Sequence, residues 1–408
     1  MQVQYRGTGH AAQQEFVDLF KYCANRALRV VTRRHSSRAA FSFSSDALDT
    51  CLMHSVSPLY AAAELQAHEH RSNHAFAEAA DSARQAAEIA HREGDHTSSW
   101  NMTFLQAENL LDADRFEDCA ALAAHLLSDT TGPRQPHDVA RAHILMARAS
   151  QGTGLLESAA QEARAAVMLT DDEAHIDINV KARQALIAAL ADAGQMEEAW
   201  SESKSLAAVI SDEVDDQQAG KAYWVIGNVA FLCDKVSEGL RYHELAAATF
   251  SPARDLDIWA KFNKASAAMR LAANIADGET LRCIERAELA TDITGGSEND
   301  LLLLRRNRAH WTLLAGDPQA AAEMLQELCR SGGMTPQNTG DACFLLGRAY
   351  LESGDEAEAR RALEKAADHF DRAGATLRAE QTREFIAVEL GPVSLWSRLW
   401  RAAGFGRH

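Results

Sequence analysis

Apolar residues recur along the chain at the three- and four-residue spacing of an α-helix, in blocks that repeat about every 40 residues. The clearest block runs from residue 340 to residue 374. Its small and apolar positions are Leu346, Gly347, Tyr350, Gly354, Ala359, Leu363 and Ala366. Gly354, followed by Asp355, is a turn signal that divides the block into two helical stretches. The pattern therefore predicts two antiparallel helices joined by a tight turn.

This block returns with its first residue near seven earlier positions, which are 302, 259, 220, 180, 140, 100 and, more loosely, 60. The predicted helix pairs are 58–71 and 73–92, 98–112 and 115–128, 137–152 and 155–170, 176–193 and 196–211, 216–233 and 236–250, 255–273 and 277–292, 299–315 and 318–331, and 337–353 and 356–372. A hairpin of this kind cannot bury its own apolar face, so neighbouring hairpins must stack to form the core. We therefore expect an all-α fold, an α-solenoid of about eight hairpins over residues 57–390, with a C-terminal capping helix at 374–390.

The block at 340–374 resembles a tetratricopeptide repeat (TPR). Other blocks match mainly at the small positions of the second helix, which are Ala159, Ala199 and Ala321. The block at 220 matches in its first helix instead, and it has Gly239 where the family usually has alanine. The resemblance implies a solenoid whose first helices line a concave groove for a protein or peptide. The period is similar to that of the repeat arrays of bacterial helix-turn-helix/TPR regulators.

The two ends of the chain do not follow the repeat. Residues 1–56 are expected to form a partly basic N-terminal helical extension, with one helix at about 11–34. This segment is too short, and lacks the apolar spacing, for a full helix-turn-helix, so a DNA-binding part is either absent or replaced by that helix. Residues 391–408 form a basic amphipathic tail containing Trp396 and Trp400. The tail suits peripheral contact with a membrane surface, a partner groove, or folding back onto the last repeat.

The formal net charge is -17. The first 50 residues carry seven Lys/Arg and four Asp/Glu, a balance of +3, so the remaining residues carry -20. Phosphates repel such a surface, and we expect no direct nucleic-acid binding. The acidity serves either solubility or a preference for cationic partners.

The seven cysteines are widely scattered and contain no C-x-x-C pair. They are interpreted as small buried hydrophobic residues in a reducing compartment. The sequence has no apolar run of transmembrane length and no signal-peptide core. Arginine greatly outnumbers lysine and alanine is abundant, which indicates a bacterial protein, and we expect it to be cytoplasmic.

No phosphate loop, dinucleotide fingerprint, zinc-protease motif or nucleophile elbow occurs in the sequence. His70 and His74 could share a helix face only if one helix continued through Ser72 and Asn73, where a turn is expected. We therefore predict a non-enzymatic protein with no cofactor and no metal site.

The resemblance places the groove at the fifth, ninth and twelfth positions of each first helix. From residue 224 to residue 348 these positions mix amides, arginines and aromatics. Amides satisfy peptide backbone groups, arginines pair with carboxylates, and aromatics supply contact area. The predicted peptide- or partner-binding residues are Arg148, Trp224, Asn228, Phe231, Asn263, Arg306, His310, Phe344 and Arg348.

Asn228 is the most informative of these residues, because peptide-clamping members of the family place an asparagine after the equivalent of Gly227. Trp224 lies one helical turn before it on the same face. The predicted ligand surface, as opposed to core, contains Trp224, Asn228, Arg306, His310 and Arg348. For Trp224 and Phe231 the alternative is ordinary packing between helices.

Two functions follow from this pattern. The first is a protein- or peptide-binding TPR scaffold that uses the concave face of the solenoid. The second is a ligand- or peptide-responsive sensor from a bacterial transcriptional-regulator family that lacks its own helix-turn-helix.

Overall fold

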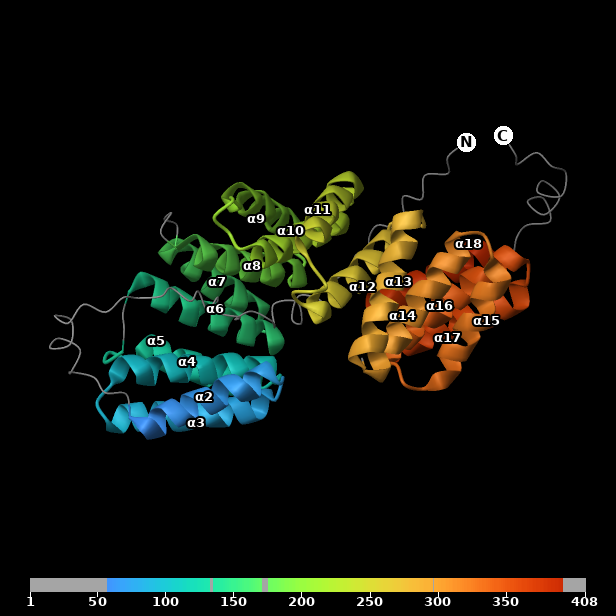
Figure 1. Cartoon of the computed structure of the whole chain (residues 1–408). Coiled ribbons are helices and arrows are strands. Elements are labelled where there is room, and N and C mark those ends of the chain that lie inside the picture. The colour runs from blue at the N-terminus through green and yellow to red at the C-terminus, as the bar shows by residue number, and fades with distance from the viewer. Residues whose placement is uncertain (1–56, 133–134, 171–174, 296, 392–408) are drawn as a thin grey trace. The chain divides into compact units, whose positions relative to one another are not determined.

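A computed structural model of the chain describes residues 57–132, 135–170, 175–295 and 297–391, which form seventeen helices and no strands (Figure 1). The predicted N-terminal extension and the tail after Gly391 lie outside these residues. The helices are α2 (Pro58–Ser72), α3 (Phe76–Arg92), α4 (His96–Asp112), α5 (Phe116–Ser128), α6 (Pro136–Gly152), α7 (Leu156–Leu169), α8 (Ile176–Asp192), α9 (Met196–Val209), α10 (Asp216–Leu232), α11 (Val236–Thr249), α12 (Leu256–Ala272), α13 (Gly278–Thr294), α14 (Glu298–Leu314), α15 (Pro318–Ser331), α16 (Pro336–Ser353), α17 (Glu356–Arg372) and α18 (Thr376–Leu390).

The described helices form eight hairpins followed by the single helix α18, so the predicted all-α solenoid is confirmed. Each predicted helix boundary lies within a few residues of the observed one. The even-numbered helices α2 to α16 are the first helices of the hairpins, and the odd-numbered helices α3 to α17 are the second helices. No helix in the described ranges combines the length and the apolarity that crossing a bilayer requires.

The turn inside each hairpin contains one residue with left-handed backbone geometry. In the first six hairpins these residues follow one another at intervals of 40, and they are His74, Asp114, Gly154, Gly194, Asp234 and Asn274. Gly316 and Gly354 occupy the same place in the last two hairpins. A left-handed residue ends a helix and reverses the chain, and Gly, Asn and Asp adopt it at the lowest steric cost. The repeat seen in the apolar pattern is therefore also a repeat of turn geometry.

Small residues let the two helices of a hairpin approach closely. The predicted small positions Ala159, Ala199 and Ala321 are all fully buried. Gly347 in α16 faces Leu363 in α17 so closely that a Cβ atom added to the glycine would lie 2.5 Å from Leu363 Cγ. The core is therefore assembled from alanine and leucine at short interhelical distance, as the low aromatic content indicates.

The chain divides into two compact units within α10, between Val229 and Ala230. The unit that ends at Val229 contains the first helices α4, α6 and α8, and in it each contacts the next. The unit that begins at Ala230 contains α12, α14 and α16, which contact one another in the same way. Among the described residues, no two second helices make comparable contacts. Within each unit, the first helices therefore lie closer together than the second helices, and the side of the stack that they form is called the inner side.

Candidate functional site

The fifth position of the first helices, predicted to face a ligand, is buried in nearly every repeat. The buried side chains at this position are Phe104, Ile144, Gln184, Trp224, Asn263 and Arg306, whereas Phe344 is half-buried. The twelfth position is also buried, except for half-buried Leu351. These two rows therefore pack between neighbouring helices.

The prediction of an exposed ligand surface is wrong for several of the proposed residues. Trp224 and Asn228 are only 1% and 2% exposed, and Arg306 is 6% exposed. Phe231 and Asn263 are buried as well. The physical reasons differ: the aromatic rings pack in the core, Asn263 donates to Trp259 O on its own helix at 2.8 Å, and Arg306 has an acidic partner on a neighbouring first helix.

Arg306 illustrates the last of these reasons. Its guanidinium on α14 donates to Asp341 Oδ2 on α16 at 3.2 Å, while Arg378 on α18 donates to Asp341 Oδ1 at 2.8 Å. All three side chains are less than a tenth exposed. The Arg378 guanidinium carbon also lies 4.8 Å from the ring centre of Phe370, in cation–π geometry. This network links three successive helices of the inner layer.

Similar buried clamps join other first helices. Arg71 on α2 forms an ion pair with Asp112 on α4 at 3.0 Å. Gln151 on α6 donates to Asp192 on α8 at 2.7 Å. Lys264 on α12 pairs with Asp300 on α14. Of the predicted polar groove residues, Arg306 therefore belongs to a set of buried clamps that join one repeat to the next.

Phe231 packs between helices as part of the core. Its ring lies 5.1 Å from the His243 ring, which lies 5.7 Å from the Phe262 ring. His243 is hydrogen-bonded to Ser266 Oγ at 3.0 Å, and burial together with the nearby Arg270 charge lowers the pKa of His243 to about 3. Phe231 also explains the unusual glycine in the second helix, because a Cβ atom added to Gly239 would lie 2.7 Å from this ring.

The ninth position remains accessible wherever it carries a long side chain. The partly exposed residues at this position are Glu108, Arg148, His310 and Arg348, although the Nε2 atom of His310 is buried. The ninth position therefore forms the accessible stripe along the inner side of each unit. Three of the predicted ligand residues, Arg148, His310 and Arg348, belong to it.

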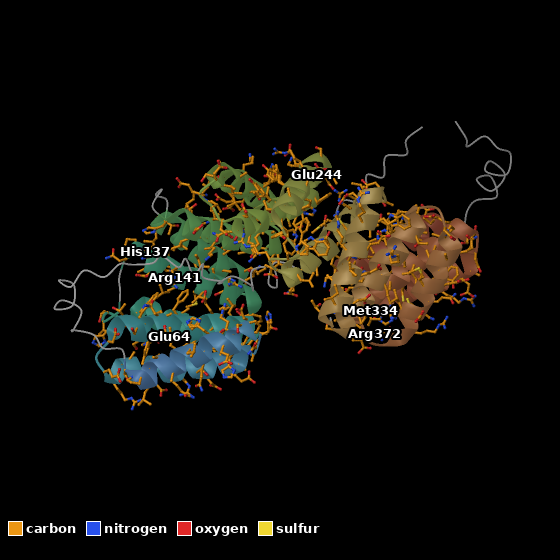
Figure 2. The ribbon with its side chains drawn as sticks, viewed as in Figure 1. Glu64, His137, Arg141, Glu244, Met334 and Arg372 are labelled. Atoms are coloured by element: carbon orange, nitrogen blue, oxygen red, sulfur yellow. The ribbon has the colours of Figure 1, made fainter. Side chains whose placement is uncertain are left out.

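The second position of each block, which was not among the predicted ligand positions, extends this stripe in the unit that ends at Val229. Arg141 and Lys181 occupy it and are partly exposed. The Arg141 guanidinium lies 4.0 Å from the Phe104 ring centre and 3.6 Å from Asp138 Oδ1. Figure 2 shows Arg141 and His137 on the same helix, α6. The spacing of seven residues between Arg141 and Arg148, two helical turns, was the signal that could have identified this position.

A pocket of about 390 Å³ lies outside the inner stripe, between the second helices α11 and α13 and above the first helix α12. Its lining residues are Glu244, Ala247, Ala248, Trp259, Phe262, Asn263, Glu279 and Arg286. Glu279 and Arg286 form an ion pair at 2.9 Å, and Glu244 is exposed on α11 (Figure 2). Of the predicted ligand residues, only Asn263 lines the pocket. An aromatic ring beside two carboxylates suits a cationic group.

The turn predicted after Ser72 is present, so His70 and His74 do not share a helix. Within the part of the chain that the structure describes, no group of three or more His, Cys, Asp or Glu side chains is arranged to hold a metal ion.

No protein-family model matches the chain, and no curated protein matches it in sequence. Solved structures similar in fold include the following two. The apo form of RapI is 9% identical with a TM-score of 0.56, over 90% of this chain and 98% of that one. The apo form of the quorum sensor NprR from B. thuringiensis is 10% identical with a TM-score of 0.57, over 88% of this chain and 98% of that one. The chain shares their helical solenoid fold of the TPR type.

Proposed function

We propose that the chain is a non-enzymatic scaffold that binds a protein or an extended peptide along the inner stripe of first helices. The strongest support is the partial exposure of the ninth position of the first helices. Long polar side chains there reach the surface of a layer whose fifth and twelfth positions are mostly buried. Arginines at these positions suit carboxylates of a ligand, because charge-assisted and bidentate hydrogen bonds are strong and geometrically specific. The proposed setting is the bacterial cytoplasm.

The inner stripe is richer in cations than the rest of the molecule, although Glu108 also belongs to it. Arg141, Arg148 and Lys181 belong to it in the unit that ends at Val229, and Arg348 belongs to it in the other unit. A chain with a net charge of -17 repels most acidic ligands over its whole surface. A local row of cations would therefore select a ligand that presents its carboxylates at the spacing of the repeats.

The test uses the full chain and three pools of fluorescent random hexapeptides, enriched in Asp and Glu, in Lys and Arg, or in neutral residues. The acidic pool should raise fluorescence anisotropy most. Arg148→Ala and Arg348→Ala should each weaken that binding by roughly 5–150-fold, the equivalent of about 1–3 kcal/mol for a charge-assisted hydrogen bond. The matched control is Arg361→Ala on the second helix α17, where the arginine is exposed and pairs with Glu358 one turn away.

Two outcomes would contradict the proposal. One is a loss of affinity in the Arg361→Ala control as large as the loss in the inner-stripe variants. The other is preferred binding of the basic pool that Trp259→Ala weakens, because the ligand would then occupy the pocket between α11 and α13.

A second candidate function is a ligand-responsive sensor from a bacterial regulator family that lacks its own helix-turn-helix. The structural similarity to the quorum sensor NprR, which extends over 88% of this chain, favours this second function. The two functions differ in their response to DNA. The scaffold should leave a random DNA duplex unshifted in an electrophoretic assay at physiological salt. A shift that disappears when residues 1–38 are deleted would favour the regulator and overturn the expectation of no direct nucleic-acid binding.

A further inference from the structure

Cys329 and Cys343 lie in contact although no cysteine motif joins them in the sequence. Their sulfur atoms are 3.0 Å apart, with Cys329 on the second helix α15 and Cys343 on the first helix α16 of the next hairpin. Cys343 is buried against Phe370, and Cys329 is partly exposed. The two cysteines are fourteen positions apart in the chain, so a search for C-x-x-C cannot find the pair.

The other described buried cysteines behave as the sequence analysis expected. Burial raises the pKa of the Cys119 thiol to about 12. Burial likewise raises the pKa of Cys283. A high pKa makes a thiol unreactive, because the thiolate is the nucleophile.

Cys343 has a different environment. The hydrogen bond shared with Cys329, together with the positive charges of Lys365 and Arg372 on α17, lowers the pKa of the Cys343 thiol. The same hydrogen bond raises the pKa of Cys329. The pair thus places a thiol of lowered pKa in contact with a second, partly exposed thiol, the arrangement of a nucleophilic cysteine and its resolving partner.

We propose that Cys329 and Cys343 form an oxidation site, at which hydrogen peroxide converts the two thiols into a reversible disulfide between α15 and α16. The thiolate of Cys343 attacks one oxygen of the peroxide, the O–O bond breaks, and the departing hydroxide takes a proton to become water. The resulting sulfenic acid is then attacked by Cys329 sulfur, which loses its proton. The S–O bond breaks, a second water leaves, and the S–S bond forms. The peroxide is reduced by the two electrons that the thiols lose.

The geometry allows this bond to form with little movement. A disulfide requires sulfurs about 2.05 Å apart, so the two atoms must approach by roughly 1 Å. The connection between the helices contains Gly332, which has left-handed backbone geometry, and Gly333. This four-residue connection, from Gly332 to Thr335, separates Ser331 at the end of α15 from Pro336 at the start of α16. The bond would fasten the seventh hairpin to the eighth.

The experiment treats the folded full-length protein with hydrogen peroxide, alkylates the remaining thiols in denaturant, and maps tryptic peptides by mass spectrometry. The expected product is a peptide pair linked through Cys329 and Cys343, lighter by two hydrogen atoms than its reduced form and separated by dithiothreitol. Cys119 and Cys283 should be recovered alkylated. The oxidised protein should also unfold at a higher temperature than the reduced protein, because a cross-link restricts the unfolded chain.

Three variants make the result specific. Cys283→Ser should keep the cross-link. Cys329→Ser should lose it and leave a sulfenic acid on Cys343 that dimedone labels, whereas Cys343→Ser should lose both the cross-link and the label. The proposal is overturned if the folded protein gives no Cys329–Cys343 peptide. It is also overturned if other cysteine pairs cross-link at least as readily, or if the cross-link appears only after denaturation.

Discussion

Arg378 donates a 2.8 Å hydrogen bond to Asp341, and both side chains are almost completely buried. The bond connects the final helix α18 to the first helix of the hairpin before it. Asp341 uses its other carboxylate oxygen for Arg306 on α14. The end of the solenoid is therefore closed by a charged network as well as by apolar contacts such as Phe344 with Phe385.

Asp341→Ala should lower the free energy of unfolding by about 3–5 kcal/mol, because it removes the carboxylate that two buried guanidinium groups share. Urea unfolding followed by circular dichroism measures this loss. The control is Asp371→Ala, which removes an exposed ion pair with Arg383 and should cost at most about 1 kcal/mol. Equal effects of the two substitutions would show that the buried network does not hold the helices together.

Gly239→Ala should destabilise the protein, although alanine normally stabilises a helix relative to glycine. The added Cβ would lie 2.7 Å from the Phe231 ring, and overpacking of this kind costs about 1–3 kcal/mol. Gly278→Ala is the matched control, since its nearest neighbour is the flexible end of Arg282 at 3.6 Å. It should be neutral or slightly stabilising in the same thermal unfolding measurement. Phe231→Leu combined with Gly239→Ala should recover part of the loss if the aromatic ring causes it.

The helices could be predicted from the sequence and most of the candidate site could not, for one physical reason. Helix limits depend on local signals, namely apolar spacing and a left-handed turn residue, which the repeat presents eight times. Exposure of a polar residue depends on a partner about one repeat away, as for Gln151 and Asp192 or Arg306 and Asp341. An arginine at the fifth position has the same local pattern whether it faces a ligand or an aspartate in the next hairpin. The contact between Cys329 and Cys343 and the pocket around Trp259 likewise depend on packing between hairpins.

Asn228 and Arg348 both occupy the ninth position of a first helix. Asn228 is only 2% exposed, whereas Arg348 is partly exposed. Asn228→Ala should lower the free energy of unfolding by about 1–3 kcal/mol, the cost of disturbing a buried polar group. Arg348→Ala should change it by no more than about 0.5 kcal/mol. Chemical denaturation of both variants tests this, and a stable Asn228→Ala protein with weakened peptide binding would restore Asn228 to the ligand surface.

His243 should make stability depend on pH below neutrality. Its pKa is about 3 in the folded protein, because burial and the Arg270 charge disfavour the imidazolium, whereas an unfolded histidine has a pKa near 6.5. Between these two values the unfolded chain binds the additional proton, so the free energy of unfolding falls as the pH is lowered. Well inside that window, this single group changes the free energy of unfolding by about 1.4 kcal/mol per pH unit. Above pH 6.5 the histidine is mainly neutral in both states, so it no longer lowers the free energy of unfolding.

His243→Asn removes this ionisation while keeping a small polar side chain near Ser266. The measured quantity is the difference in free energy of unfolding between the wild type and this variant, obtained from urea titrations between pH 5 and pH 8. The difference should be constant from pH 7 to pH 8, where neither state of His243 binds the proton. Below about pH 6 the wild type should lose free energy of unfolding relative to the variant, because only the wild type carries a histidine that stays neutral in the folded state. A difference that is flat across the whole range would mean that His243 is hydrated or otherwise able to accept its charge in the folded protein.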